Sequence, residues 1–579
     1  MPPKAAKAVA PKAASDAKKP AATKTSSKAT SKTAAATKAT TSKAAAAKAT
    51  KKDDKSASAR AKSAEKTEDE PVTNGAPASK RKASETESEP DEDVVMEEPQ
   101  AKKTKIEDAP VRKAPVKAKK TAHVAIGKKI NDAPTQVLDV YVFGEGTSGE
   151  LGLGSKRANG KKPIDVKRPR LNDNLSAKTV GVVQIACGGM HVVALTRDNK
   201  ILTWGVNDQG ALGRDTNWDG GLRDADKAED SDSEDEDDTG INPKESTPTA
   251  LSEEDFAPGT KFVQVEASDS ASFALTEDGR VYGWGTFRSS DGILGFTETV
   301  RIQSRPALIP ALKNIKALAS GANHILALDH KGNVVAWGCG QQNQLGRRII
   351  ERNKMSSLIP QGVGLPRGKI AKIACGSYHS FAIDKNGAVW GWGLNNFGEI
   401  GVENSAGEDD AVILKPVKIS FLADHAITDI AGGIHHSLAC SSKGELFAWG
   451  RIDGYQVGFE SEAVEKVDEE YVIRDEKGTA RILVKPTKHE GKWSGVSDIV
   501  AVSAGTDNSF AISKDGKVYS WGFSSNYQTG QGTLDDIHVP TLIDNSAIRD
   551  KKIIAAGAGG QFSVLIGVPE GATTNGEIN

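Results

Sequence analysis

The sequence is poor in the residues that build most metal and catalytic centres. Its 579 residues include only four cysteines, and these lie far apart with no C-x-x-C pair: Cys187, Cys339, Cys375 and Cys440. Such spacing argues against a zinc site and against a disulfide framework. No P-loop, Ser/His/Asp or paired-carboxylate motif is present either. We therefore expect reduced cysteines within strands, no bound metal or cofactor, and no hydrolytic chemistry.

Long apolar runs are also absent from the sequence. No segment approaches the length of a membrane span, and the N-terminus MPPKAAKAVA lacks the apolar core of a secretory signal. These two absences predict an intracellular protein that makes no membrane contact.

Positive charge is concentrated in the first part of the chain. Residues 1–120 contain 28 Lys/Arg and 17 Asp/Glu, a net +11, which leaves 48 and 60, a net −12, for residues 121–579. Large apolar residues are scarce in this basic part, so it cannot bury enough surface to offset the entropy of ordering. We expect residues 1–130 to form a disordered tail that binds DNA phosphates without reading sequence.

Two short basic clusters within the tail resemble nuclear import signals. They are Lys80, Arg81 and Lys82, and Lys102, Lys103 and Lys105. An import receptor is the expected partner of these clusters. Because such clusters also arise by chance in a lysine-rich chain, a solvated linker remains the alternative.

A repeat dominates the rest of the chain. Two copies are VVQIACGGMHVVALTRDNKILTWGVNDQGALG (182–213) and IKALASGANHILALDHKGNVVAWGCGQQNQLG (315–346). Short apolar segments alternate with glycine turns and end in an aromatic-glycine pair, which is typical of several short antiparallel strands per unit. Such pairs begin at seven positions: Phe143, Trp204, Trp284, Trp337, Trp392, Trp449 and Trp521.

The first and last units are incomplete and complement each other. Residues 138–152 supply only the second half of a unit, and residues 552–567 supply only the first half. A unit built from both segments closes a ring and removes exposed sheet edges. We predict an all-β, seven-bladed propeller over residues 137–567, with tryptophans packed between blades, an acidic insertion at 223–240 and a short disordered tail at 568–579.

One unit departs from the common spacing. The closing glycine follows the aromatic residue by nine positions in six units, but by eleven in WGTFRSSDGILG, from Trp284 to Gly295. Closure of the ring does not require these two additional residues. Their presence marks this turn as a candidate functional element.

A second signal lies in the turn that precedes each second strand. Histidine recurs thirteen residues before tryptophan in four units, at His191, His324, His379 and His436. This recurrence favours a structural role for His379 over a role as the base for a Cys375 nucleophile.

The neighbouring turn residues, by contrast, differ from unit to unit. They include Asp269, Asn323, His435 and Asp507. Binding positions are free to differ where structural positions repeat, so these residues form a candidate binding rim. Sequence drift in loops produces the same pattern and is the alternative.

The repeat A-C-G-x-x-H-x-x-A-L, with its closing Leu-Gly or Ile-Gly, resembles that of the regulator of chromosome condensation. This family comprises chromatin-bound exchange factors of the Ran GTPase, and the present chain resembles its fungal members over residues 137–567. The resemblance implies that the longer turn is a β-wedge that inserts into Ran and promotes nucleotide loss without covalent chemistry. The wedge would consist of Phe287, Arg288, Ser289, Ser290, Asp291, Gly292 and Ile293.

The resemblance also implies that Asp269, Asn323, His435 and His436 belong to a Ran-binding rim. Two positions depart from the family: Asn323 stands where an acidic residue is usual, and Phe562 stands where the closing blade usually has a rim histidine.

The resemblance further implies core histones or the nucleosome as partners and a nuclear, chromatin-associated location. A role in nucleocytoplasmic transport and in mitotic and nuclear organisation follows from it. A chromatin-binding propeller scaffold without exchange activity is the alternative function.

Overall fold

A computed structural model describes residues 125–158, 160–219, 239–490 and 498–571. The predicted N-terminal tail up to residue 124, both import clusters, positions 220–238 of the acidic insertion and residues 572–579 lie outside the described residues. In the part that the structure describes, no helix is long and apolar enough to cross a membrane.

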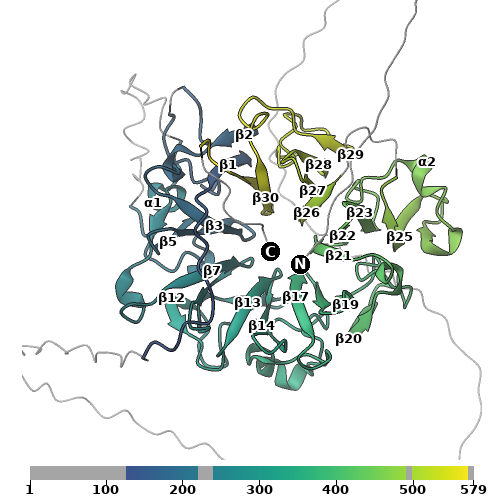
Figure 1. Cartoon of the computed structure of the whole chain (residues 1–579), viewed down its shortest axis with the longest axis horizontal. Helices are drawn as coiled ribbons and strands as arrows, with labels where there is room; N and C mark the ends of the chain where they lie inside the picture. Colours follow the sequence, from purple (N-terminus) through teal and green to yellow (C-terminus); the bar gives the residue numbers. More distant parts are fainter. Residues whose placement is uncertain (1–124, 159, 220–238, 491–497, 572–579) are drawn as a thin grey trace, which may run out of the picture. The chain divides into compact units, whose positions relative to one another are not determined.

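Seven antiparallel sheets form a ring of blades around a central axis (Figure 1). Each blade is named here after the aromatic residue of its third strand. The first three complete blades, from inner to outer strand, are the Trp204 blade, with β3 (Val182–Cys187), β4 (His191–Thr196), β5 (Ile201–Gly205) and β6 (Thr249–Ala250); the Trp284 blade, with β7 (Phe262–Ala267), β8 (Ala271–Thr276), β9 (Val281–Gly285) and β12 (Gln303–Leu308); and the Trp337 blade, with β13 (Ile315–Ser320), β14 (His324–Asp329), β15 (Val334–Gly338) and β16 (Gln361–Gly362).

Three further blades continue the ring in chain order. They are the Trp392 blade, with β17 (Ile370–Cys375), β18 (His379–Asp384), β19 (Val389–Leu394) and β20 (Val412–Lys418); the Trp449 blade, with β21 (Ile427–Gly432), β22 (His436–Ser441), β23 (Leu446–Arg451), β25 (Ala480–Lys488) and β24 (Val472–Arg474); and the Trp521 blade, with β26 (Ile499–Ala504), β27 (Asn508–Ser513), β28 (Val518–Gly522) and β29 (Ile537–Leu542). Among the described residues, two short α-helices lie in connecting loops: α1 (Pro243–Ser246) and α2 (Ser461–Val464).

The last blade is built from both ends of the propeller sequence, as predicted. Its strands are β30 (Ile553–Ala558), β31 (Phe562–Gly567), β1 (Asp139–Gly144) and β2 (Val166–Leu171). β1 pairs with β31 from Asp139 opposite Gly567 to Gly144 opposite Phe562. This pairing closes the ring, because the last strand of the chain hydrogen-bonds to the first.

The fixed spacing between the aromatic residue and the closing glycine has a packing cause. In six turns the closing glycine lies against the aromatic ring of the next blade; Gly152, for example, faces Trp204, and Gly530 faces Phe143 across the closure. The glycines have φ between +64° and +79° in these six turns, which favours glycine. The expectation that the tryptophans pack between blades is confirmed, since all six are at most 2% exposed.

Polar contacts link the blades beneath these turns. Five of the six tryptophans donate their indole N–H to a turn carbonyl of the preceding blade; Trp449, for example, donates to Glu399 O at 2.9 Å. The Ser437 hydroxyl donates to the same carbonyl at 2.8 Å, and His379 Nε2 lies 2.9 Å from that hydroxyl.

This histidine-serine-carbonyl relay occurs at four blade junctions. The histidines are His191, His324, His379 and His436. All four are buried, and burial lowers the pKa of each of them, to about 4 for His191 and about 3 for His324. The structural role predicted for the recurrent histidine is confirmed.

The connections divide between two faces of the ring. The turn from first to second strand and the loop from third to fourth strand share one face, which we call the hairpin face. The turn from second to third strand lies on the opposite face, and residues 125–137 pack there, with Gly127 N donating to Asp278 Oδ2 at 2.7 Å and Asn131 Nδ2 donating to Ile315 O at 2.9 Å. The chain therefore enters the propeller along the opposite face. Residues 125–130, predicted to belong to the disordered tail, are held there by such contacts.

Ring closure predicts a strong effect at Gly530. A methyl group there would lie 2.8 Å from the Phe143 ring, and φ is +70°. Gly530→Ala should lower the free energy of unfolding by about 2–4 kcal/mol, combining left-handed strain with overpacking. The matched control is Gly478→Ala, with φ +81° and open space around the added methyl group, which should cost about 1 kcal/mol. Equal losses in urea unfolding would contradict this account of closure.

Candidate functional site: a braced hairpin and a polar rim

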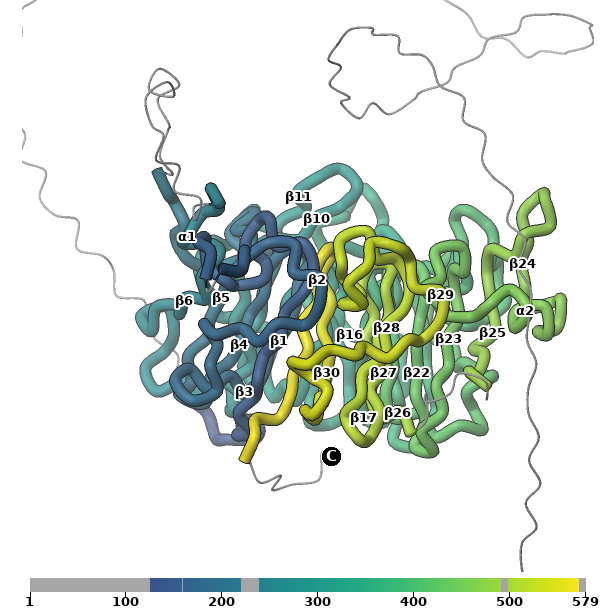
Figure 2. Tube along the Cα trace, turned by 90° about the horizontal axis from the view of Figure 1, so that it is seen from above, coloured from purple at the N-terminus to yellow at the C-terminus, as the bar shows by residue number. Residues whose placement is uncertain are grey.

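The longer turn of the Trp284 blade forms a hairpin of its own. β10 (Phe287–Ser289) pairs with β11 (Gly292–Gly295), Ser289 lies opposite Gly292, and Ser290 and Asp291 make the two-residue turn. Figure 2 shows this hairpin rising from the ring on one side. Ser290 and Asp291 are exposed, so the tip is polar, as the sequence predicted.

The base of the hairpin is held by aromatic packing. Phe287 is fully buried, and its ring stacks on Phe273 and Phe296 with centroid distances of 6.1 and 6.3 Å. Trp337 of the next blade packs edge-on against Phe273. This junction carries Ala271 in place of the recurrent histidine, so an aromatic cluster occupies the place of the polar relay found at four other junctions.

Side chains from both neighbouring blades brace the hairpin. Gln341, from the Trp337 blade, accepts from Ser290 N at 2.9 Å and donates to the Ser290 hydroxyl at 2.7 Å. Lys354, in the 3-10 helix Glu351–Leu358, lies 3.0 Å from the Asp291 carboxylate. Asp208, from the Trp204 blade, pairs with Arg288 at 2.9 Å. The hairpin is thus positioned by contacts on both sides, and no sequence pattern marked these three bracing residues.

Asn323 joins the hairpin to the rim. Its Oδ1 accepts from the Arg288 backbone N–H at 2.8 Å, and its Nδ2 donates to Asp269 Oδ2 at 3.2 Å. An aspartate at this position could not donate to Asp269, and it would add a second negative charge there. Asn323 can therefore donate to the carboxylate of Asp269 and accept from the hairpin backbone at the same time.

Asp269 lies at the wall of the central cavity. The residue is exposed, but the protein around it displaces much of the water near its carboxylate. This desolvation raises the pKa of Asp269 to about 6, while the Asn323 hydrogen bond and the Arg288 charge oppose the rise. Desolvation by the nearby protein and the charge of Asp269 likewise raise the pKa of Tyr378. Tyr378 is thus a further residue of this part of the rim.

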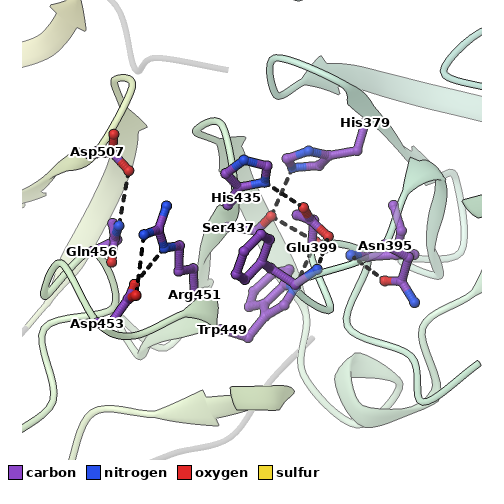
Figure 3. A network of polar contacts seen from close by, with 12 residues as sticks. His379, Asn395, Glu399, His435, Ser437, Trp449, Arg451, Asp453, Gln456 and Asp507 are labelled. Carbon is purple, nitrogen blue, oxygen red and sulfur yellow. Dashed lines mark hydrogen bonds and ion pairs between the residues drawn. The ribbon is translucent and has the colours of Figure 1, made fainter. Parts of the chain in front are cut away.

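A second part of the rim surrounds His435 (Figure 3). His435 Nδ1 lies 2.9 Å from Glu399 Oε1, and its ring packs against Phe397 at a centroid distance of 4.5 Å. Glu399 is buried and comes from the preceding blade. Farther around the ring, Gln456 Nε2 donates to Asp507 Oδ1 at 2.9 Å. His435 and Asp507 are thus each held by the turn of the blade before, whereas Asp269 is held by Asn323 of the blade after it.

Of the residues expected at the rim, His436 lies below its surface, and so does Phe562, which departs from the family pattern. His436 is fully buried and lies 2.9 Å from the Ser509 hydroxyl in the relay, so its side chain does not reach the rim surface. Phe562 is also buried, at 1% exposure, at the position of the relay histidine; the exposed turn residue of that blade is Gln561. Adjacent residues at a strand end point to opposite sides, and the recurrence of the histidine already marked this position as structural.

The axis of the ring contains a cavity of about 160 Å³ lined by turn residues of all seven blades. Close to it, Glu266 accepts from Gln264 at 2.8 Å and lies 2.9 Å from the Ser320 hydroxyl, which also lies 2.7 Å from Ala267 O. Ser320 has one hydroxyl proton for two acceptors, so a protonated Glu266 satisfies this arrangement best. Burial raises the pKa of Glu266 to about 7.

The cysteines and the described acidic groups offer no other chemistry. All four cysteines are free, and burial raises the pKa of the Cys375 thiol, which lies 3.7 Å from Ala319 O. A thiol in this environment is not an activated nucleophile. Within residues 125–571, apart from the undescribed positions, no group of three His, Cys, Asp or Glu side chains could hold a metal ion.

The fold and the site together define a class of protein: a closed propeller that presents a rigid polar hairpin beside a polar rim, and hence a platform for binding a macromolecule. Residues 139–565 match the model of the RCC1-like domain. The chain therefore belongs to the family of the regulator of chromosome condensation, the family that the repeat resembles.

The similarity to fungal relatives is extensive. The guanine nucleotide exchange factor SRM1 of Saccharomyces cerevisiae is 43% identical over 75% of this chain and 88% of its own. The crystal structure of Prp20p from the same yeast, reported with its binding properties to Gsp1p and histones, is 41% identical with a TM-score of 0.66 over 75% of this chain and 92% of that chain. Yeast RCC1 (Prp20) bound to Kap60 is 39% identical with a TM-score of 0.66, over 79% and 96%.

The bracing contacts predict that Gln341 orders the hairpin tip. Gln341→Ala removes the acceptor of the Ser290 amide, and the loss of a hydrogen bond of ~1 kcal/mol should make hydrogen exchange at this amide about fivefold faster. Gln342→Ala, one residue away, leaves this acceptor in place and serves as the control. Unchanged exchange at Ser290 in the Gln341 variant would show that the brace does not order the tip.

The raised pKa of Glu266 predicts a pH-dependent stability difference. The native pKa is about 7 and the unperturbed value is 4.5, so the wild-type chain loses stability as pH rises from 4.5 through 7. Glu266→Gln stays neutral, and its amide can donate to Ser320. The variant should be more stable than the wild type by on the order of 1–3 kcal/mol at pH 8, and this gain should shrink towards pH 5. Urea unfolding of both proteins at several pH values measures this stability difference. A difference that does not vary with pH would refute the raised pKa of Glu266.

Proposed function

We propose that this chain is a guanine-nucleotide exchange factor for a Ran-type GTPase, and that the hairpin β10–β11 is the wedge that enters the GTPase. The observation that carries this proposal is the braced polar tip of Ser290 and Asp291, in the one blade whose turn is longer than ring closure requires. Its relative SRM1 carries the name of such a factor, and the Prp20p structure concerns binding to Gsp1p.

Exchange by this route makes or breaks no covalent bond. An exchange protein that binds the nucleotide-free GTPase best weakens the affinity of the GTPase for nucleotide. By linkage, bound nucleotide weakens the affinity of the GTPase for the exchange protein by the same ratio. Each tenfold loosening of the nucleotide requires about 1.4 kcal/mol of differential binding.

The bracing contacts favour such differential binding. Gln341, Lys354 and Asp208 fix the hairpin before a partner arrives. A rigid hairpin loses little conformational entropy when it binds, so more of the contact energy remains to displace the loops that hold the nucleotide. The exposed Ser290 and Asp291 supply the polar groups that would meet those loops.

The rim completes the proposed GTPase-binding surface. Asp269 and Asn323 continue directly from the base of the hairpin, and His435 lies farther around the same face. We assign the contact to these three side chains. The buried His436 would act only by holding the turn of His435.

The two faces allow a second partner. The chain enters along the face opposite the hairpin, through contacts such as Gly127 with Asp278. The basic tail that precedes this segment in the sequence can bind DNA or histones while the hairpin face holds the GTPase. We therefore propose a nuclear, chromatin-associated factor whose import clusters around Lys80 and Lys102 bind an import receptor. The complex of Kap60 with yeast RCC1 and the histone binding studied for Prp20p are consistent with these partners.

The wedge predicts a kinetic defect when the hairpin is shortened. Deleting Ser289 and Ser290 restores the nine-residue spacing and should slow the release of fluorescent GDP from Ran at least tenfold, equivalent to ~1.4 kcal/mol of lost differential binding. Histone binding by the full chain serves as the control and should be unchanged. Normal GDP release by a folded deletion variant would leave a chromatin-binding scaffold as the better description.

The rim predicts a similar defect without loss of the fold. Asp269→Asn should slow GDP release several-fold and change the melting temperature little, because Asp269 is exposed. His435→Ala should slow GDP release by a similar factor and also lower the melting temperature, because it removes a partner of the buried Glu399. Asp198→Asn makes the same chemical change in an exposed turn of the opposite face and should have no effect. Equal rates for the Asp269 and Asp198 variants would place the GTPase contact elsewhere.

A further inference from the structure

A strongly basic edge lies on the Phe143 blade, in the loop between β1 and β2 and in β2 itself. We define the basic edge as five exposed cations: Lys156, Lys161, Lys162, Lys167 and Arg168. It stands out because the chain after residue 120 has a net charge of −12. Neither the hairpin nor the rim uses it.

The basic edge is structurally fixed. Ala158 and Lys161 form a reciprocal pair of backbone hydrogen bonds of 3.0 Å. Arg170 donates to Lys162 O at 2.9 Å, and Lys167 lies over the Tyr527 ring at 5.2 Å. The edge borders a groove of about 510 Å³ that includes Leu171. These contacts hold the cations in place but do not neutralise them.

The partners of the basic edge in the described chain are carbonyl oxygens and an aromatic ring, not carboxylates. Arg168 donates to Asp544 O at 3.4 Å. Among the residues that the structure describes, none of the five cations has a carboxylate within 4.0 Å. Asp165 lies in the same loop, and the charge of Arg168 contributes to lowering the pKa of Asp544. The five cations outnumber these two carboxylates, so the edge keeps a net positive charge that attracts anions.

The end of the acidic insertion is anchored at the start of this edge. Thr239, the first described residue at the end of the insertion, donates through its backbone N–H and its hydroxyl to Ser155 O, directly before Lys156. The chain segments before and after the insertion are hydrogen-bonded to each other. Asn242 donates to Thr216 O at 3.0 Å, and the Thr216 hydroxyl donates to the Glu245 carboxylate at 2.9 Å. The acidic segment therefore leaves the propeller beside the cations.

We propose that the basic edge is an acidic-peptide binding surface, and that its ligand is the acidic insertion of the same chain, residues 223–238. This segment carries ten acidic and two basic residues. The anchor at Thr239 makes the contact intramolecular, with an effective concentration in the millimolar range for a short flexible connection. Opposite charges attract strongly only within a Debye length, about 8 Å at physiological salt, so the contact should weaken as salt is added. The insertion thus shields a basic surface on the hairpin face from other polyanions.

A peptide-binding experiment tests this proposal. The probe is a fluorescent peptide with the sequence of residues 223–238, and the proteins are the full chain and a variant in which a Gly-Ser linker of equal length replaces these residues. The peptide should bind the linker variant at least tenfold more tightly than the intact chain, and binding should weaken with salt. Lys161→Glu with Lys162→Glu in the linker variant should abolish the gain.

The matched control in the linker variant is Lys331→Glu with Lys385→Glu, in exposed turns of the opposite face, which should leave peptide binding unchanged. Thermal melting confirms that all variants are folded. Equal peptide binding by the intact chain and the linker variant, or binding that ignores Lys161 and Lys162, would overturn the proposal. A short DNA duplex provides a second test. If it binds through Lys161 and Lys162 equally tightly to the intact chain and to the linker variant, the proposal is overturned, because the insertion would then not cover the basic edge and nucleic acid would be its ligand.

Discussion

The ring depends on one shared acceptor at each regular blade junction. A turn carbonyl of one blade accepts from the indole of the next blade, and at several junctions also from a serine hydroxyl that contacts a buried histidine, as for Glu399, Trp449 and Ser437. A buried indole N–H or hydroxyl without a partner costs about 1–3 kcal/mol. The position of the turn carbonyl is therefore closely constrained. This constraint fixes the spacing between the aromatic residue and the closing glycine.

The hairpin exists because one junction is built differently. Between the Trp284 and Trp337 blades, the stacked rings of Phe273, Phe287 and Phe296 stabilise the interface. Apolar packing does not require a carbonyl at a defined point. The turn is consequently free to extend into β10 and β11, and the side chains of the adjacent blades then fix it. The regular junctions stabilise the fold, and the irregular junction carries the proposed function.

The two faces of the ring differ in the polar groups that they present. The relay histidines are buried and neutral, whereas Asp269, Asp208 and Arg288 gather beside the hairpin. The opposite face receives the N-terminal segment through Asp278 and Asn131. The hairpin and the N-terminal segment thereby occupy opposite faces of the propeller.

The sequence by itself determined the repeat, the number of blades, the closure of the ring and the position of the hairpin, because these depend on glycine, aromatic and histidine spacing within one unit. It also marked Asp269, Asn323 and His435 by their variation. Tertiary structure alone revealed Gln341, Lys354 and Glu399, which reach their partners from other blades at separations that no local pattern records. It also separated His435 from the buried His436, since the pleat of a strand turns neighbouring side chains to opposite sides.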